Sequence, residues 1–176
     1  MTDYVFGYAS LVALEGADSL PGRLRGFRRR WGVAMNNWEG GEGAKHWLDR
    51  ATGERPHIRV AYLDIYEHSG SAVNGLALPV DSVRLSVLDA RELNYERADV
   101  TSSFEPEVEG RVFTYVGLGA ARERCRHGVG AGDIFVSRDY AVSVRLAFER
   151  LGQRALAEFD RTTDPLPFPE RDLLRA

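Results

Sequence analysis

The segment Leu88–Tyr95, LDARELNY, contains the carboxyl group best placed for acid–base chemistry. At about 100° per residue, Leu85, Leu88 and Glu92 fall within an arc of roughly 60° on a helix, so Glu92 shares a stripe with two leucines. Desolvation, the negative end of the helix dipole and the nearby charge of Asp89 all disfavour its ionised form. We therefore predict a raised pKa for Glu92 and proton exchange near neutral pH, with an ion pair to an arginine as the alternative explanation.

A second feature with chemical potential is FGYASLV, residues 6–12, where aromatic residues alternate as in a β-strand and then give way to Ala9 and Ser10. Small side chains leave backbone N–H groups uncovered, and successive uncovered N–H groups can bind an anion. The sequence therefore predicts a cradle of backbone amides directly after the first strand.

Other motifs give little support to a nucleotide, a metal or a protein nucleophile. The glycine pattern of YVGLGAAR, residues 115–122, lacks the third glycine of a dinucleotide fingerprint because Arg122 stands in its place, so we predict a strand-to-helix turn. The four histidines lack the close spacing of a zinc site, and no Gly-x-Ser-x-Gly motif occurs. Cys125, the only cysteine, is expected on a surface helix without a catalytic role.

The most basic segment is GRLRGFRRRW, residues 22–31. Alternation along a strand divides its arginines between two faces, so they form no single basic stripe. With a net charge of −3 for the whole chain, we expect a solvated strand and no nucleic-acid partner.

Composition limits the class of protein. The chain has 176 residues, of which 44% are hydrophobic and 28% charged, as expected for one soluble globular domain. No stretch approaches the roughly 18 apolar residues of a membrane helix, and the apolar start lacks the basic region of a secretory signal. The single cysteine forms no intrachain disulfide, so we expect a cytoplasmic protein without a membrane partner. The oligomeric state is not indicated.

The elements that must position these motifs follow from hydrophobic periodicity and turn signals. The predicted strands span residues 4–9, 22–35, 57–66, 72–80, 95–102 and 111–116, and the predicted helices span residues 83–93, a segment from 137 with Tyr140, Val144, Ala147 and Leu151 on one face, and a piece around 155–159. About six strands with few crossover helices indicate an α+β fold: a small, mostly antiparallel β-barrel flanked by helices.

The helix that carries Glu92 has apolar residues on two sides. Besides the leucine stripe, Val83, Val87 and Ala90 form a second apolar side. We therefore expect this helix to be largely buried.

A long connection at about residues 36–56 contains several glycines, among them Gly41 and Gly43, and two tryptophans, Trp38 and Trp47. A connection of this length without periodicity is often functional. It is either a hairpin whose tryptophans cover the end of the barrel or a lid over a site. From about residue 162 the proline-rich end predicts an extended tail on the same single domain.

Taken in order, these motifs resemble the γ-glutamylcyclotransferase-like superfamily, including its ChaC-type members. FGYASLV looks like the family's Tyr-Gly-Ser loop, and GRLRGFRRRW is similar to its arginine-rich second strand. LDARELNY looks like the segment with the catalytic glutamate, and VSRDY, residues 136–140, resembles the Pro-Ser-x-x-Tyr helix start. The resemblance runs from about residue 4 to 165 and leaves the connection at 36–56 unmatched.

The resemblance implies a cofactor-free and metal-free reaction, of transferase or lyase type, that belongs to pathways such as glutathione metabolism. A γ-glutamyl compound closes on itself and yields 5-oxoproline and an amine. The substrate's own α-amine is the nucleophile, so one carboxyl group can carry out both proton transfers, and by resemblance and environment this group is Glu92. The resemblance places six further residues at the substrate: Tyr8, Ala9, Ser10, Leu11, Tyr95 and Tyr140. For the two later tyrosines, core packing is the alternative role.

Three points stay open. Ala9 stands where the family has glycine, which would cost roughly 1–2 kcal/mol if the position needs a positive φ. The leaving group can be an amino acid, a dipeptide or a plain amine, and the candidates for selecting it are Trp38, Trp47 and the glycine-rich connection. The sequence does not indicate which arginine binds the substrate carboxylate. The alternative function is a non-catalytic protein that binds a γ-glutamyl ligand on the same fold.

Overall fold

The computed structural model describes residues 2–40 and 46–176, so Gly41 and Gly43 of the predicted connection lie outside the described residues. The strands are β1 (Asp3–Gly7), β2 (Leu20–Asn36), β3 (Trp47–Asp49), β4 (Arg59–Val80), β5 (Tyr95–Asp99), β6 (Phe104–Glu105), β7 (Val112–Gly117), β8 (Ile134–Ser137), β9 (Glu170–Arg171) and β10 (Leu173–Arg175). The α-helices are α1 (Ser82–Arg91), α2 (Gly119–Ala131), α3 (Arg138–Arg150) and α4 (Gln153–Arg161), and two short 3-10 helices are η1 (Ser10–Leu14) and η2 (Thr101–Ser103).

In the described part of the chain, a curled sheet of eight strands organises the fold. Six of its strands lie in the order β5-β7-β1-β4-β2-β6, and β8 pairs in parallel with both β4 and β9. Most neighbours are antiparallel, and β1 with β7 is a parallel exception. The order has two ends, so the sheet is a half-barrel and not a closed barrel. The predicted α+β class, the mostly antiparallel sheet and the flanking helices are confirmed.

The two longest strands, β2 and β4, pair from Leu20 opposite Ala77 to Asn36 opposite Arg59. Register shifts at Gly26 and Gly32 bend this ribbon and so help to curl the sheet. The prediction of separate strands at 57–66 and 72–80 was wrong, because both belong to β4. The turn-forming residues between them form an irregularity opposite Gly26, which has a φ of 80°, while the pairing continues on either side.

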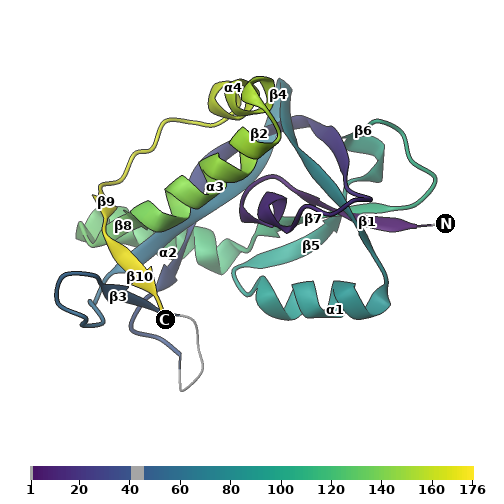
Figure 1. The fold of residues 1–176 in the computed structure, drawn as a ribbon. Coiled ribbons are helices and arrows are strands. Elements are labelled where there is room, and N and C mark those ends of the chain that lie inside the picture. The colour runs from purple at the N-terminus through teal and green to yellow at the C-terminus, as the bar shows by residue number, and fades with distance from the viewer. Residues whose placement is uncertain (1, 41–45) are drawn as a thin grey trace.

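Helices cover both faces of the β2–β4 ribbon (Figure 1), and they decide where the arginines of β2 go. Arg29 points to the α3 and α4 side, 5.1 Å from the ring centroid of Phe148, and Arg30 points to Asp64 on the opposite face. The expected solvated strand was wrong: Arg29 is fully buried, because helices cover the strand. The other arginines of this segment form ion pairs with Glu158, Glu105, Asp164 and Asp64.

Helix α1 begins where predicted, since the Asp81 side chain accepts a hydrogen bond from the Arg84 N–H. It is not largely buried, however. Val83 and Val87 are 71% and 62% exposed, and only Leu88 is fully inside. Figure 1 shows α1 beside β5 at the edge of the molecule, so one face meets the sheet and the second apolar side meets solvent.

The C-terminal part follows the predicted helical spacing. Ser137 caps α3, and Val144 and Ala147 are buried beneath it. The tail after α4 is extended, as predicted, and its last strand β10 pairs with β3 in a separate two-stranded sheet. Cys125 lies in α2, but it is buried and not on the surface; burial raises the pKa of its thiol and so disfavours a reactive thiolate.

Candidate active site

A small recess of about 30 Å³ lies between η1 and the end of α1. It brings together all seven residues that the sequence predicted for the site, namely Tyr8, Ala9, Ser10, Leu11, Glu92, Tyr95 and Tyr140. Leu63 and Tyr115 also line it, although no motif of the sequence marks them as site residues. A volume of this size holds about two water molecules, so a bound group larger than that must extend beyond the recess.

The loop after β1 turns at Ala9 into η1. The first hydrogen bond of this helix runs from the Val12 N–H to the Ala9 carbonyl at 3.0 Å, so the amides of Ser10 and Leu11 precede it. Ala9 has a φ of −143° and a ψ of −122°, so the position does not have the positive φ that would favour glycine. The close approach falls instead at Gly7, where a Cβ would lie 2.7 Å from the Cβ of Leu11.

The buried side chain of Arg29 fixes the backbone of this loop. Arg29 donates from Nε to the Tyr8 carbonyl at 2.7 Å and also hydrogen-bonds Thr162 and Asn74. Burial lowers the pKa of Arg29 to about 9, so it is still charged at neutral pH. Arg29 is therefore engaged in fixing the cradle and does not reach a substrate carboxylate.

Glu92 is the C-cap residue of α1, and its side chain is 14% exposed. Its predicted stripe with Leu85 and Leu88 faces the protein. Arg91 Nε lies 3.2 Å from Glu92 Oε1, so the arginine pairing that the sequence left open as an alternative does occur.

The predicted influence of Asp89 on Glu92 is partly offset by the partners of Asp89. Its carboxylate accepts a hydrogen bond from the Tyr115 hydroxyl and forms an ion pair with Arg97, both at 2.8 Å. Tyr115 and Arg97 thus reduce the effect of the Asp89 charge on Glu92.

An unpaired stretch of strand edge supports the tyrosines. Among the described residues, β4 has a strand on its second side only at residues 59–60 and 76–80. Between them, the Leu63 carbonyl accepts a hydrogen bond from Tyr95 at 2.8 Å, and the Leu63 backbone also hydrogen-bonds Tyr140. The two tyrosines therefore complete the hydrogen bonding of a strand while their rings line the recess.

Burial raises the pKa of each tyrosine in the recess, and the charge of Glu92 contributes in the same direction. These hydroxyls therefore stay protonated at neutral pH. Glu92 is the one carboxylic acid among the residues that line the recess.

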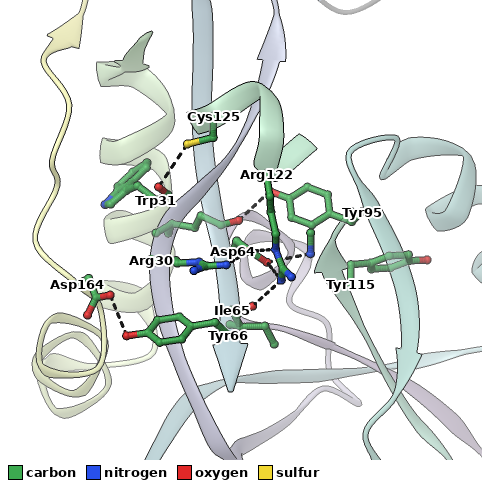
Figure 2. A network of polar contacts seen from close by, with 12 residues as sticks. Arg30, Trp31, Asp64, Ile65, Tyr66, Tyr95, Tyr115, Arg122, Cys125 and Asp164 are labelled. Carbon is green, nitrogen blue, oxygen red and sulfur yellow. Dashed lines mark hydrogen bonds and ion pairs between the residues drawn. The ribbon is translucent and has the colours of Figure 1, made fainter. Parts of the chain in front are cut away.

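A network of ion pairs surrounds Asp64 of β4, which follows the recess residue Leu63 in the sequence (Figure 2). Asp64 is fully buried and accepts hydrogen bonds from the Gly117 N–H at 2.8 Å and from Arg122 Nε at 2.9 Å. Arg122 also donates to the Ile65 carbonyl at 3.2 Å, on the strand edge that carries Leu63. The predicted strand-to-helix turn at Gly117 is confirmed, and its Arg122 belongs to this network.

The connection between β2 and β4 contributes one of its two tryptophans to the surroundings of the site. Trp47 is buried and lines a larger cavity next to the recess, whereas Trp38 stacks on His57 with ring centroids 4.0 Å apart. Among residues 2–40 and 46–176, no three His, Cys, Asp or Glu side chains are arranged to hold a metal ion. In the same ranges, none of the helices has the length and apolarity needed to cross a membrane.

Comparisons with known proteins support the fold. No protein-family model matches the sequence, and no curated protein matches it. The chain is similar to a solved structure named gamma-glutamyl cyclotransferase, with 12% identity over 98% of this chain and 94% of that one and a TM-score of 0.57. It is also similar to YkqA from Bacillus subtilis, with 17% identity over 95% of this chain and 56% of that one and a TM-score of 0.58. The uncharacterized protein loc79017 from Homo sapiens has 13% identity over 97% of this chain and 93% of that one, with a TM-score of 0.55. The fold that the sequence resemblance implied is thus confirmed, and at these identities the similarity extends to the fold alone.

Proposed function

We propose that this protein is a γ-glutamylcyclotransferase-like enzyme, which converts a γ-glutamyl compound to 5-oxoproline and releases an amine. The observation that carries the proposal is the meeting of Glu92 with the Ser10 and Leu11 end of η1 in one recess. The fold shared with a protein named gamma-glutamyl cyclotransferase supports it.

The chemistry needs one acid–base group and a site for negative charge. A bond forms between the substrate's α-nitrogen and its γ-carbonyl carbon, and the bond from that carbon to the leaving nitrogen breaks. Two protons leave the α-ammonium and two arrive on the leaving nitrogen, which departs as an ammonium ion. Glu92 accepts and delivers these protons in turn, and the amides of Ser10 and Leu11 stabilise the negative charge that develops on the carbonyl oxygen.

The protonated tyrosines suit a positioning role. Tyr95 and Tyr140 are tied to the Leu63 backbone, so their rings hold the folded substrate in a shape close to that of the attack. The recess alone is too small for a whole glutamyl group, which therefore spans the recess and its mouth.

The test is a panel of γ-glutamyl amino acids, γ-glutamyl peptides and γ-glutamyl amines, assayed for release of 5-oxoproline. In Glu92→Gln, kcat should fall at least about 100-fold, because glutamine keeps the shape but relays no proton. Glu96→Gln, an exposed position on β5, is the matched control and should keep full turnover.

Stability separates the catalytic role of Glu92 from a purely structural one. Arg91 is 30% exposed and Glu92 is 14% exposed, so water screens this ion pair in part and its loss should cost about 1 kcal/mol. If Glu92 only holds the helix, Glu92→Gln will unfold slightly earlier and still turn over at the rate of the parent, and the mechanism is then wrong.

The second candidate is a binding protein for γ-glutamyl ligands, which the Arg91–Glu92 contact favours because it occupies the carboxylate. This function predicts that calorimetry detects binding of a γ-glutamyl compound while no member of the panel yields 5-oxoproline. Turnover of any member excludes it.

A further inference from the structure

A second cavity of about 720 Å³ opens at the mouth of the recess. Ser10, Glu92, Tyr95 and Tyr140 line both spaces, so Glu92 lies at their junction. Any group attached to a glutamyl head in the recess therefore extends into the larger cavity.

One wall of this cavity is aromatic and held in place by hydrogen bonds. Trp47 Nε1 donates to the Tyr62 hydroxyl at 2.6 Å, and the Tyr62 ring packs edge-on against Tyr140 with centroids 5.0 Å apart. The buried Asn37 side chain bonds both the N–H and the carbonyl of Trp47, at 2.8 and 2.9 Å. This aromatic wall is made of Trp47, Tyr62 and Tyr140, and it links Tyr140 at the recess to Trp47 in the β3–β10 sheet.

The charges that line the cavity are not fully paired. Arg91 is paired with Glu92, and Asp139 is paired with Arg50 outside the cavity. Arg124 donates to two neutral acceptors, the Ala34 carbonyl and the Asn94 side chain, at 2.9 and 2.8 Å.

Arg175, on β10, is the other cation of the cavity, and it forms no ion pair with a residue of the described ranges. Arg175 is the register partner of Trp47 in the β3–β10 sheet, and Trp47, Tyr62 and Arg175 line the same cavity. Burial raises the pKa of Tyr62 to about 12, and the charge of Arg175 acts against this rise. Glu39 is the remaining acid of the lining, and it accepts a hydrogen bond from Asn36 at 2.6 Å. Arg175 is therefore free to bind an anion beside the aromatic wall.

We infer that the larger cavity receives the leaving group, and that this group is an apolar α-amino acid or short peptide whose free carboxylate is bound by Arg175. This inference rests on the proposed function. An arginine beside an aromatic surface provides the two contacts that such a group needs: a charge-assisted bond for the carboxylate and an apolar face for the side chain. A plain amine would use only the second contact.

A matched pair of substrates tests the carboxylate. γ-Glutamyl-phenylalanine and γ-glutamyl-phenethylamine differ only in that group. The parent protein should prefer γ-glutamyl-phenylalanine by about tenfold or more in kcat/KM, as expected for a charge-assisted hydrogen bond. Equal values, or a preference for the amine, overturn the inference while the proposed function stands. If neither these two nor the rest of the panel releases 5-oxoproline, the proposed function itself is overturned.

A matched pair of variants tests Arg175. In Arg175→Gln, the ratio of the two kcat/KM values should fall toward one, whereas Arg150→Gln, an exposed position at the end of α3, should keep the ratio of the parent. An unchanged ratio in Arg175→Gln, with its melting temperature equal to that of the parent, shows that Arg175 does not bind the carboxylate. γ-Glutamyl-glycine as a third substrate tests the aromatic wall: a kcat/KM equal to that of γ-glutamyl-phenylalanine contradicts its role.

Discussion

The buried carboxylate of Asp64 should be a main support of the sheet beneath the site, and Asp64→Asn tests it. The side chain has no solvent exposure and accepts hydrogen bonds from the Gly117 N–H and from Arg122, while Arg30 Nη2 lies 3.5 Å away. Asparagine has nearly the same shape but no charge, and its NH₂ group must face one of these donors. The variant therefore leaves two arginines without their buried counter-charge.

The magnitude follows from the exposure of the partners. Removing one member of a fully buried ion pair costs about 3–5 kcal/mol. Arg122 and Arg30 are 28% and 38% exposed, so water can solvate them in part and the low end applies, about 3 kcal/mol. For a domain of 176 residues, this corresponds to a melting temperature lower by about 6–12 °C.

The assay is urea and thermal unfolding of Asp64→Asn beside Asp160→Asn. Asp160 pairs with Arg145 at the surface, where the two side chains are 46% and 51% exposed, so its loss should cost less than about 1 kcal/mol. An unchanged m value would show that the two variants differ in stability and not in the compactness of the unfolded chain. If Asp64→Asn is no less stable than Asp160→Asn, the network around Asp64 does not support the fold and the reasoning is refuted.

Two further predictions concern the cradle and the aromatic wall. Gly7→Ala places a Cβ 2.7 Å from Leu11 Cβ, so kcat/KM should fall at least about tenfold. Ala9→Gly, at a φ of −143°, should change kcat/KM by less than about threefold. If Ala9→Gly lowers kcat/KM more than Gly7→Ala does in a 5-oxoproline assay, the close approach is not at Gly7. The pKa of tyrosine is about 10 in the unfolded chain, and burial raises the pKa of Tyr62 to about 12 in the folded protein. Tyr62 therefore contributes stability that is complete below about pH 10 and is lost as the pH rises toward about 12. Urea unfolding between pH 8 and 11.5 should therefore show a shallower loss of stability in Tyr62→Phe than in the parent, and equal slopes would contradict the shifted pKa.

Much of the fold and of the candidate site could be predicted from local patterns. The small residues after β1 predicted a turn with exposed amides, and the stripe of Leu85, Leu88 and Glu92 predicted which face of α1 meets the protein. Ser137 predicted the start of α3. Each of these features depends on side chains a few residues apart, whose spacing is set by the period of the helix or strand.

Only the tertiary structure decided which faces are covered and which distant segments meet. Arg29 and Val87 illustrate this. Helices packed over β2 bury the arginine, whereas none of the described residues covers the outer side of α1, so Val87 lies in solvent. Short strands such as β3 and β10 have no periodicity of their own, and their hydrogen bonds come from a partner more than 120 residues away. Burial and long-range pairing depend on the packing of the whole chain, so the cavity beside Glu92, its aromatic wall and Arg175 became visible only in three dimensions.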